Sequence, residues 1–279
     1  MARRKVVRTS ARASRKKSKR RLSVAALVPK PTTRRRWFNK FRRASTTLQV
    51  IVGLAVIAVV WLILNVTYQV IRKPSELFFP VSDSLYKTPT ETWDEYEDLF
   101  REHSTDVMTP EFLAALAQAE GSGNPVARTY WRWSFTHRPF EIYRPASSAV
   151  GMYQFTDGTF EEARRYCIRD HKVAADGDCW FNSLYTRTVP SHAVELTSAY
   201  LDTRVSQTLS RFGITKATRQ QKQDLATLIH LCGAGAGAAY ARRGLRLAPG
   251  QRCGDHDARG YLQRINSMKK IFARLNRES

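Results

Sequence analysis

The chain has 279 residues, with 46 lysines and arginines against 24 aspartates and glutamates, and its formal net charge is +22. Residues 1–47 hold 18 of the basic side chains and no acidic one, since the first carboxylate is that of Glu76. The rest of the chain carries 28 basic and 24 acidic groups, which excludes a protein that binds nucleic acid over its whole surface. With 43% apolar residues, this part can bury the core of one domain.

The basic segment, residues 1–47, is rich in Arg, Lys, Ser, Thr and Ala and contains Pro29 and Pro31. Such a composition repels itself and cannot bury enough apolar area to offset chain entropy, so we expect a disordered cytoplasmic tail. The preferred interpretation is that its charge only sets the membrane topology. The alternatives are nonspecific electrostatic binding to anionic lipid headgroups or to nucleic acid.

Residues 48–71 form a run of 24 residues without a charged side chain. A helix of this length reaches about 36 Å, and the hydrocarbon core of a bilayer is about 30 Å thick, so we expect a transmembrane helix. A buried core helix of this length would be unusual. A cleaved signal peptide is disfavoured because a long segment precedes the run and no small-x-small site follows it. The excess of basic residues before the run predicts a cytoplasmic N-terminus and export of everything that follows.

The exported part begins with residues 72–106, which contain three prolines followed by an acidic amphipathic stretch at 91–102. We expect a stalk that ends in a short helix. The compact domain is predicted to span residues 107–279.

The first helix of this domain is predicted at residues 111–120. Thr109 is a suitable N-cap, Pro110 suits the first helical position, and residues 121–125 (Gly-Ser-Gly-Asn-Pro) contain a C-cap glycine and a breaker. Periodicity predicts four further helices, at residues 158–167, 191–212, 219–232 and 257–276. A long aromatic loop separates the first two helices at residues 129–150, and strand-like alternation is scarce, so the fold class is mainly α.

Four cysteines, Cys167, Cys179, Cys232 and Cys253, all lie on the side predicted to be exported. An even number in an oxidising compartment predicts two disulfides, and we expect neighbours to pair, Cys167 with Cys179 and Cys232 with Cys253. Free buried thiols and a zinc site are the alternatives. No Cys-x-x-Cys pair supports zinc, and no metal spacing involves His137, His171 or His230, so no metal or other cofactor is predicted.

An acidic residue continues the apolar stripe of the helix predicted at 111–120. Leu113, Leu116 and Ala117 form this stripe, and Glu120 is its next position. If Glu120 faces the core, burial favours its protonated form, which a general acid requires. The alternative is that Glu120 points into solvent where the helix frays.

Four segments in order resemble the motifs of lytic transglycosylases of the soluble lytic transglycosylase (SLT) family, which are lysozyme-like. Residues 119–125 (Ala-Glu-Gly-Ser-Gly-Asn-Pro) resemble the Glu-Ser-x-x-Asn-Pro signature, with Gly121 in place of serine. Residues 149–155 are similar to the Gly-Leu-Met-Gln segment, and Thr159 follows where the family has Pro-x-Thr. Residues 231–237 resemble the Ala-Tyr-Asn-Ala-Gly-x-Gly block, and residues 261–265 the closing Tyr-Val-x-x-Val. The resemblance covers residues 109–270.

The resemblance implies a lysozyme-like helical catalytic domain anchored in a bacterial inner membrane, with the domain in the periplasm. It implies cleavage of peptidoglycan between N-acetylmuramic acid and N-acetylglucosamine with a 1,6-anhydro product, and Glu120 as the catalytic acid and base. Residues expected to contact the glycan are Asn124, Trp131, Met152, Tyr153, Gln154, Gly233, Gly235 and Tyr261. Trp133, Tyr130 and Tyr143 offer further flat faces for sugar rings, or form a satellite core.

The third block departs from the family, because Cys232 and Gly233 stand where members usually have tyrosine and asparagine. Tyr200 and Tyr240 are candidates to replace that tyrosine. Two other functions therefore stay open: a catalytically inactive glycan-binding or envelope-scaffold protein, and a hydrolytic muramidase. A muramidase generally needs a second carboxylate, for which Asp157, Glu161 and Glu162 are candidates, although helix capping also explains them.

Overall fold

The computed structural model describes residues 39–279, so the predicted disorder of the basic segment lies almost wholly outside the described residues. The described chain is mainly helical, as predicted, with three short two-stranded sheets. It divides into two compact units, residues 1–61 and residues 62–279. The boundary between the two units lies inside the first long helix, and the elements that follow this helix all belong to the second unit.

That helix is α2, Thr46–Arg72, and it is long and apolar enough to cross a membrane. Only 6% of the residues in its most apolar stretch are buried, so its side chains do not form a protein core. The predicted boundaries, 48–71, agree with it to within two residues.

Short helical turns follow at η2 (Pro74–Phe78), α3 (Phe79–Ser82) and η3 (Asp83–Leu85). The next helix, α4 (Pro89–Glu102), begins with a capping box between Thr88 and Glu91. Its aromatic side chains Trp93, Tyr96 and Phe100 are buried in the main core. The expectation of a stalk over residues 72–106 is therefore wrong for α4, because an aromatic stripe at helical spacing packs α4 into the domain.

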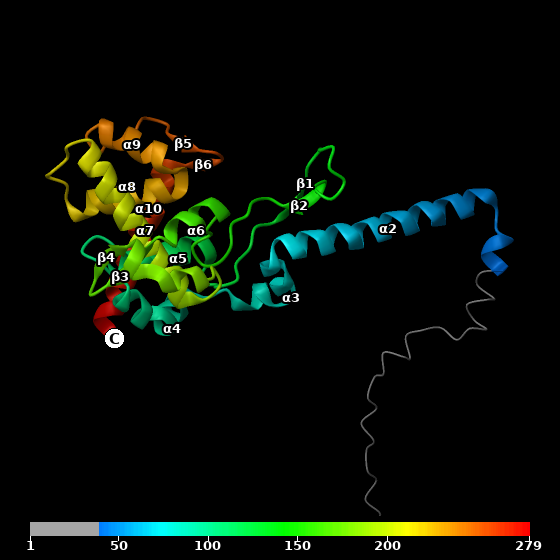
Figure 1. Ribbon diagram of the computed structural model, residues 1–279, viewed down its shortest axis with the longest axis horizontal. Helices are drawn as coiled ribbons and strands as arrows, with labels where there is room; N and C mark the ends of the chain where they lie inside the picture. Colours follow the sequence, from blue (N-terminus) through cyan, green and yellow to red (C-terminus); the bar gives the residue numbers. More distant parts are fainter. Residues whose placement is uncertain (1–38) are drawn as a thin grey trace, which may run out of the picture. The chain divides into compact units, whose positions relative to one another are not determined.

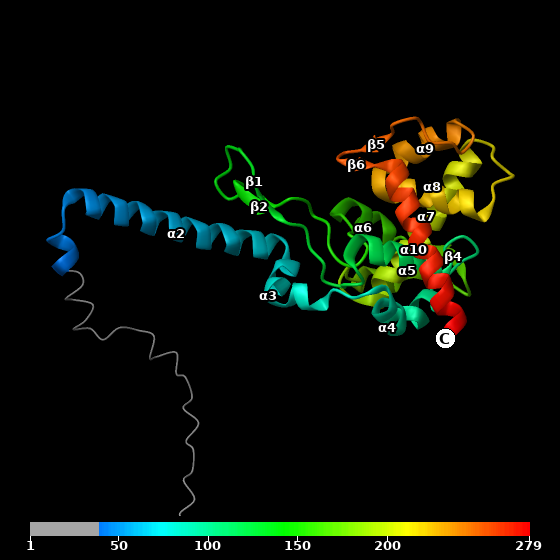
Figure 2. The same ribbon diagram turned by 180° about the vertical axis from the view of Figure 1, so that it is seen from behind.

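The helix that bears Glu120 is α5 (Pro110–Gly121), and Thr109 caps it by accepting a hydrogen bond from the amide of Phe112, as predicted. Residues 112–117 are fully buried, and α5 packs against α4 and against the C-terminal helix α10 (Ala258–Glu278) (Figures 1 and 2). The helix ends in the predicted segment, where Ser122 (φ 49°) and Gly123 (φ 65°) both adopt the left-handed conformation.

Three of the four other predicted helices are confirmed, as α7 (Pro190–Arg211), α8 (Arg219–Cys232) and α10. The helix predicted at 158–167 is shorter: α6 (Asp157–Ala163) stops, and the chain continues into a strand. An additional helix, α9 (Ala234–Arg242), occupies the glycine-rich block.

The sheets are antiparallel hairpins: β1 (Trp131–Trp133) with β2 (Tyr143–Pro145), β3 (Tyr166–Arg169) with β4 (Lys172–Ala175), and β5 (Arg252–Cys253) with β6 (His256–Asp257). Both predicted disulfides are present. Cys167 of β3 joins Cys179 of η4 (Asp176–Leu184), with the Cα atoms 5.6 Å apart. Cys232 joins Cys253, with the Cα atoms 5.2 Å apart.

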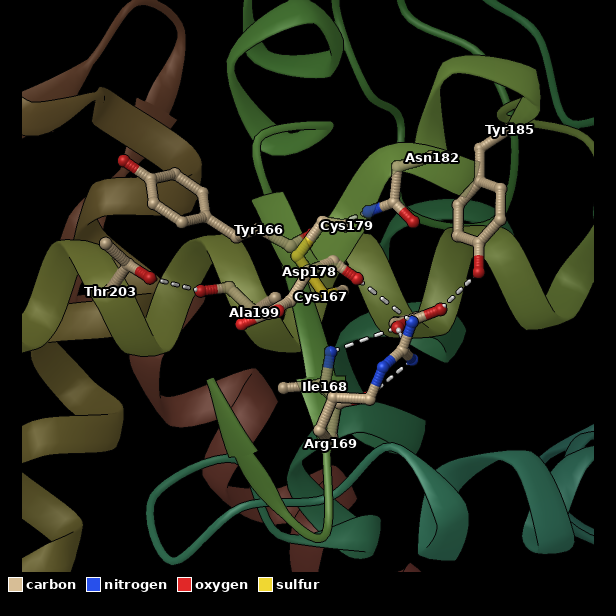
Figure 3. Close-up of a disulfide and its surroundings, with 11 residues drawn as sticks. Tyr166, Cys167, Ile168, Arg169, Asp178, Cys179, Asn182, Tyr185, Ala199 and Thr203 are labelled. Carbon is tan, nitrogen blue, oxygen red and sulfur yellow. Dashed lines mark hydrogen bonds and ion pairs between the residues drawn. A yellow bond between two sulfur atoms is a disulfide. The ribbon is translucent and has the colours of Figure 1, made fainter. Parts of the chain in front are cut away.

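A buried carboxylate binds the strand that carries Cys167. Figure 3 shows the surroundings of the Cys167–Cys179 disulfide. Glu195 of α7 is 2% exposed and accepts hydrogen bonds from the amide of Ile168 at 3.0 Å and from the hydroxyl of Tyr185 at 2.7 Å. Burial, and then this bond to Glu195, raise the pKa of Tyr185 to about 12. Arg169 is 3.6 Å from the same carboxylate. These contacts hold the β3–β4 hairpin on α7.

Candidate functional site

The carboxylate of Glu120 lies in the last turn of α5, on the stripe that Leu113, Leu116 and Ala117 begin. These three apolar side chains are fully buried, and the side chain of Glu120 is only 17% exposed. The helix does not fray at this point, because Ser122 and Gly123 both donate backbone hydrogen bonds to it. The interpretation that Glu120 faces inward is therefore confirmed. Its protonation state stays a prediction.

Tyr261, in the first turn of α10, donates a hydrogen bond from its hydroxyl to Oε1 of Glu120. The tyrosine is 5% exposed, and burial, followed by the charge of Glu120, raises its pKa well above the ordinary value. A raised pKa keeps the hydroxyl neutral, and therefore able to donate, near neutral pH. The tyrosine that donates to Glu120 thus belongs to the segment at residues 261–265, and whether Tyr200 or Tyr240 takes the place of the missing tyrosine stays a prediction.

His230, in the last turn of α8, is the second neighbour of Glu120. Its Nε2 atom is 3.8 Å from Oε1 of Glu120, and its side chain is 11% exposed. Sequence reasoning missed this residue, because no metal spacing marks it. The available signal was its position three residues before Gly233, at the edge of the third block.

The segment that resembles Gly-Leu-Met-Gln packs directly against Gly121. A Cβ atom on Gly121 would lie 2.8 Å from the Cα atom and 2.9 Å from the carbonyl oxygen of Met152. Gly151 has φ +84°, and a Cβ atom there would lie 2.3 Å from the carbonyl oxygen of Arg187. A side chain at position 121 is therefore excluded, because the backbone of residues 151–152 occupies its space.

Three predicted glycan contacts are corrected by the structure, because the side chains are fully buried. Met152 and Tyr153 belong to the core, and the hydroxyl of Tyr153 donates to the carbonyl of Leu113. Asn124 is also fully buried, and its amide donates to the carbonyl of Ser82. A glycan cannot reach these atoms, so all three residues have structural roles.

Gln154 differs from these three in being partly exposed. It has a positive φ of 49°, and its amide donates to the carbonyls of Ala127 and Gly151. Its side chain therefore stabilises the turn that packs on Gly121, and its contact with a glycan stays a prediction.

Residues 231–237, the third of the four segments, have exposed glycines at 233 and 235 and a buried glycine at 237. Gly233 and Gly235 are exposed, with open space around the position of a Cβ atom, and their contact with a glycan stays a prediction. Gly237 is buried, where a Cβ atom would lie 2.5 Å from the side chain of Ile229, so this glycine allows α9 to pack on α8. Cys232 forms the disulfide to Cys253 and joins the end of α8 to the hairpin that precedes α10.

Trp131 lies outside the group formed by Glu120, Tyr261 and His230. Its indole N–H donates to Glu76 at 2.8 Å, and its ring packs on Tyr143 with centroids 5.1 Å apart. The expected contact of Trp131 with a glycan stays a prediction. A cavity of about 630 Å³ lies in this region, lined by the end of α2, residues 144–148 and residues 185–188. Glu120 is not part of its lining.

The candidate second carboxylates are all held by arginines. Asp157 pairs with Arg187 at 2.8 Å, Glu161 pairs with Arg164, and Glu162 pairs with Arg204. Ion pairing gives each of the three a structural explanation. Among the described residues, no group of three or more His, Cys, Asp or Glu side chains could hold a metal ion.

Comparison with protein-family models finds no match for this chain, and comparison with curated proteins finds no relative.

Replacing Tyr261 by phenylalanine tests the pairing with Glu120. We expect the turnover rate on glycan strands to fall about tenfold or more, because the carboxyl group loses the donor that positions it. The Michaelis constant should change little, and the free energy of unfolding should fall by about 1 kcal/mol. Tyr96→Phe is the matched control, since Tyr96 is a buried core tyrosine of α4 whose pKa is likewise raised, chiefly by burial. Equal turnover in the two variants would contradict the role of Tyr261.

Proposed function

We propose that this protein is a lytic transglycosylase that cleaves the glycan strands of peptidoglycan, with Glu120 as the single catalytic acid and base. The observation that carries the proposal is the inward-facing carboxylate of Glu120, which sits beside a tyrosine donor and a histidine at the meeting of α5, α8 and α10. The exposed Gly233–Gly235 turn begins three residues after His230 and leaves backbone open to a sugar ring.

The reaction needs a proton for the leaving oxygen, which Glu120 donates as the bond between C1 of N-acetylmuramic acid and that oxygen breaks. The 6-hydroxyl of the same sugar then attacks C1, and the Glu120 carboxylate takes the hydroxyl proton. The products are a 1,6-anhydro end and a free hydroxyl end, and Glu120 is protonated again. One carboxyl group therefore suffices, whereas most glycosidases need two. Tyr261 stabilises the carboxylate between the two steps.

We propose further that α2 anchors the enzyme in a bacterial inner membrane, with the N-terminus in the cytoplasm and the catalytic domain in the periplasm. The length and apolar character of α2 and the charge excess before it support this topology. Two disulfides agree with an oxidising compartment.

Product analysis tests the function directly. The full chain in detergent is incubated with purified glycan strands, and the products are identified by mass spectrometry. Anhydro ends are expected. Reducing ends would instead identify a hydrolytic muramidase, and intact strands that retain the protein would identify an inactive glycan-binding protein. The use of Cys232 and Gly233 at family site positions makes this last outcome a specific alternative.

A further inference from the structure

The last two turns of α2 carry one polar face on an otherwise apolar helix. Asn65, Tyr68, Gln69 and Arg72 are spaced i, i+3, i+4 and i+7, so they share this face. Asn65 is 0% and Gln69 is 5% exposed, whereas their neighbour Ile63 is 59% exposed. The polar face is thus covered by protein, while apolar side chains around it remain open.

Three of these four side chains, those of Tyr68, Gln69 and Arg72, contact the segment between β1 and β2. The amide of Gln69 donates to the backbone carbonyl of Phe140 at 2.5 Å, and the rings of Tyr68 and Phe140 are 5.5 Å apart. Arg72 pairs with Glu141 at 3.2 Å. We name residues 129–150 the aromatic hairpin. It is fixed to the C-terminal end of α2 by a hydrogen bond, a ring contact and an ion pair.

The length of α2 places this contact at the edge of a bilayer. Its 27 residues reach about 40 Å, against a hydrocarbon core of about 30 Å. The run without charges begins near residue 46 and ends at Arg72, so the last two turns, which also hold Asn65 and Gln69, lie at the headgroup layer. A neighbouring backbone carbonyl is the partner that an amide at this depth requires.

The aromatic hairpin also exposes large aromatic side chains, of which Trp133 packs one part of its ring on Tyr143 with centroids 4.7 Å apart. Phe135 is fully exposed, Tyr130 is 72% exposed and Trp133 is 64% exposed. A cluster of this kind on a soluble surface marks an interaction site. Tryptophan and tyrosine are enriched at the interface between membrane and water, where the ring is buried and the polar edge stays hydrated.

The charge of the aromatic hairpin suits a layer of anionic headgroups. Arg72, Arg138 and Arg144 all pair with the single carboxylate of Glu141, which leaves this cluster a net charge of +2. Arginines can extend their guanidinium groups to phosphates while the aliphatic part of the side chain stays in the apolar layer.

We propose that the aromatic hairpin is a membrane-docking element, which inserts Trp133 and Phe135 into the headgroup layer of the leaflet that α2 enters from the exported side. The hairpin then ties the catalytic domain to the bilayer surface at a second point. This inference rests on α2 as a membrane span, and it does not depend on glycan cleavage. A glycan strand is the alternative occupant of the exposed rings.

Fluorescence quenching in bilayers tests the proposal. The full chain is reconstituted in vesicles of zwitterionic and anionic lipids whose acyl chains carry bromine either near the headgroup or near the chain end. The emission of Trp133 is obtained as the difference between the wild type and Trp133→Phe. The emission of Trp180, an exposed tryptophan in η4, is obtained in the same way from Trp180→Phe and serves as the control.

We expect bromine near the headgroup to quench Trp133 about twofold or more, and to leave Trp180 unchanged. Phe135→Asp places a charge at the fully exposed tip and should remove most of this quenching without changing the thermal midpoint, whereas Phe181→Asp should not. Unquenched Trp133, or a Trp133 signal that responds only to added glycan strands, would overturn the docking.

The emission of Trp61, obtained as the difference between the wild type and Trp61→Phe, tests separately whether α2 spans the membrane. Trp61 lies inside α2, so bromine near the chain end should quench it. Quenching of Trp61 without Trp133 overturns the docking alone. Loss of both signals overturns the membrane span and the docking with it. Cleavage assays play no part in either result.

Discussion

Replacing Glu120 by glutamine should abolish cleavage of glycan strands while the protein stays folded. The amide has nearly the shape of the carboxyl group and can accept the hydrogen bond of Tyr261, but it can neither deliver a proton to the leaving oxygen nor take one from the 6-hydroxyl. A loss of about 10³-fold or more is expected, since general acid–base catalysis contributes about 10²–10⁴-fold at each step. Mass spectrometry of the products and a thermal unfolding curve measure the two properties separately.

Glu95→Gln is the matched control for this experiment. Glu95 is a carboxylate of the same domain, its side chain is 54% exposed, and its partner is Lys87. We expect wild-type cleavage from this variant. Retained activity in Glu120→Gln, with the same anhydro products, would refute the role of Glu120. Loss of activity in both variants would indicate that the assay reports folding rather than chemistry.

Restoring the serine of the family signature, by Gly121→Ser, should damage the protein. The new Cβ atom would lie 2.8 Å from the Cα atom of Met152 and 3.2 Å from the carbonyl oxygen of Gly151, so backbone must move. Overpacking of this kind costs about 1–3 kcal/mol, which corresponds to a fall in thermal midpoint of about 5 °C. Because the displaced segment lies next to Glu120, cleavage should fall as well.

The control for this substitution is Gly158→Ser. Gly158 lies in the first turn of α6, where a Cβ atom would meet nothing within 4 Å. Its thermal midpoint should stay within about 1 °C of the wild type, because substitutions without new contacts have small effects. If both serine variants are equally stable, the close approach of residues 151–152 to Gly121 is not a feature of the folded protein.

Short stretches of sequence were sufficient to predict the helices and disulfides that interactions between nearby residues determine. The bounds of α8 follow from the Thr218 cap and the apolar periodicity, and both disulfides follow from the order of the cysteines along the chain. The inward position of Glu120 also follows from its place on an apolar stripe. In each case the information lies within about twenty residues of sequence.

Tertiary contacts explain the parts that could not be predicted. α6 ends early because residues 166–169 pair with residues 172–175 and are joined to η4 by a disulfide. The glycines of α9 disfavour a helix by about 1 kcal/mol each, and packing of Gly237 on Ile229 overrides this preference. A motif marks Met152 and Tyr153 but says nothing of their exposure, and His230 meets Glu120 only through the packing of two helices.

The donor to Glu120 comes from the last helix of the chain, 141 positions beyond the carboxylate. A polypeptide is made from its N-terminus, so a growing chain carries Glu120 long before it carries Tyr261. Truncated translation products, and fragments cut before Ala258, therefore contain the acidic residue without the group that orients it.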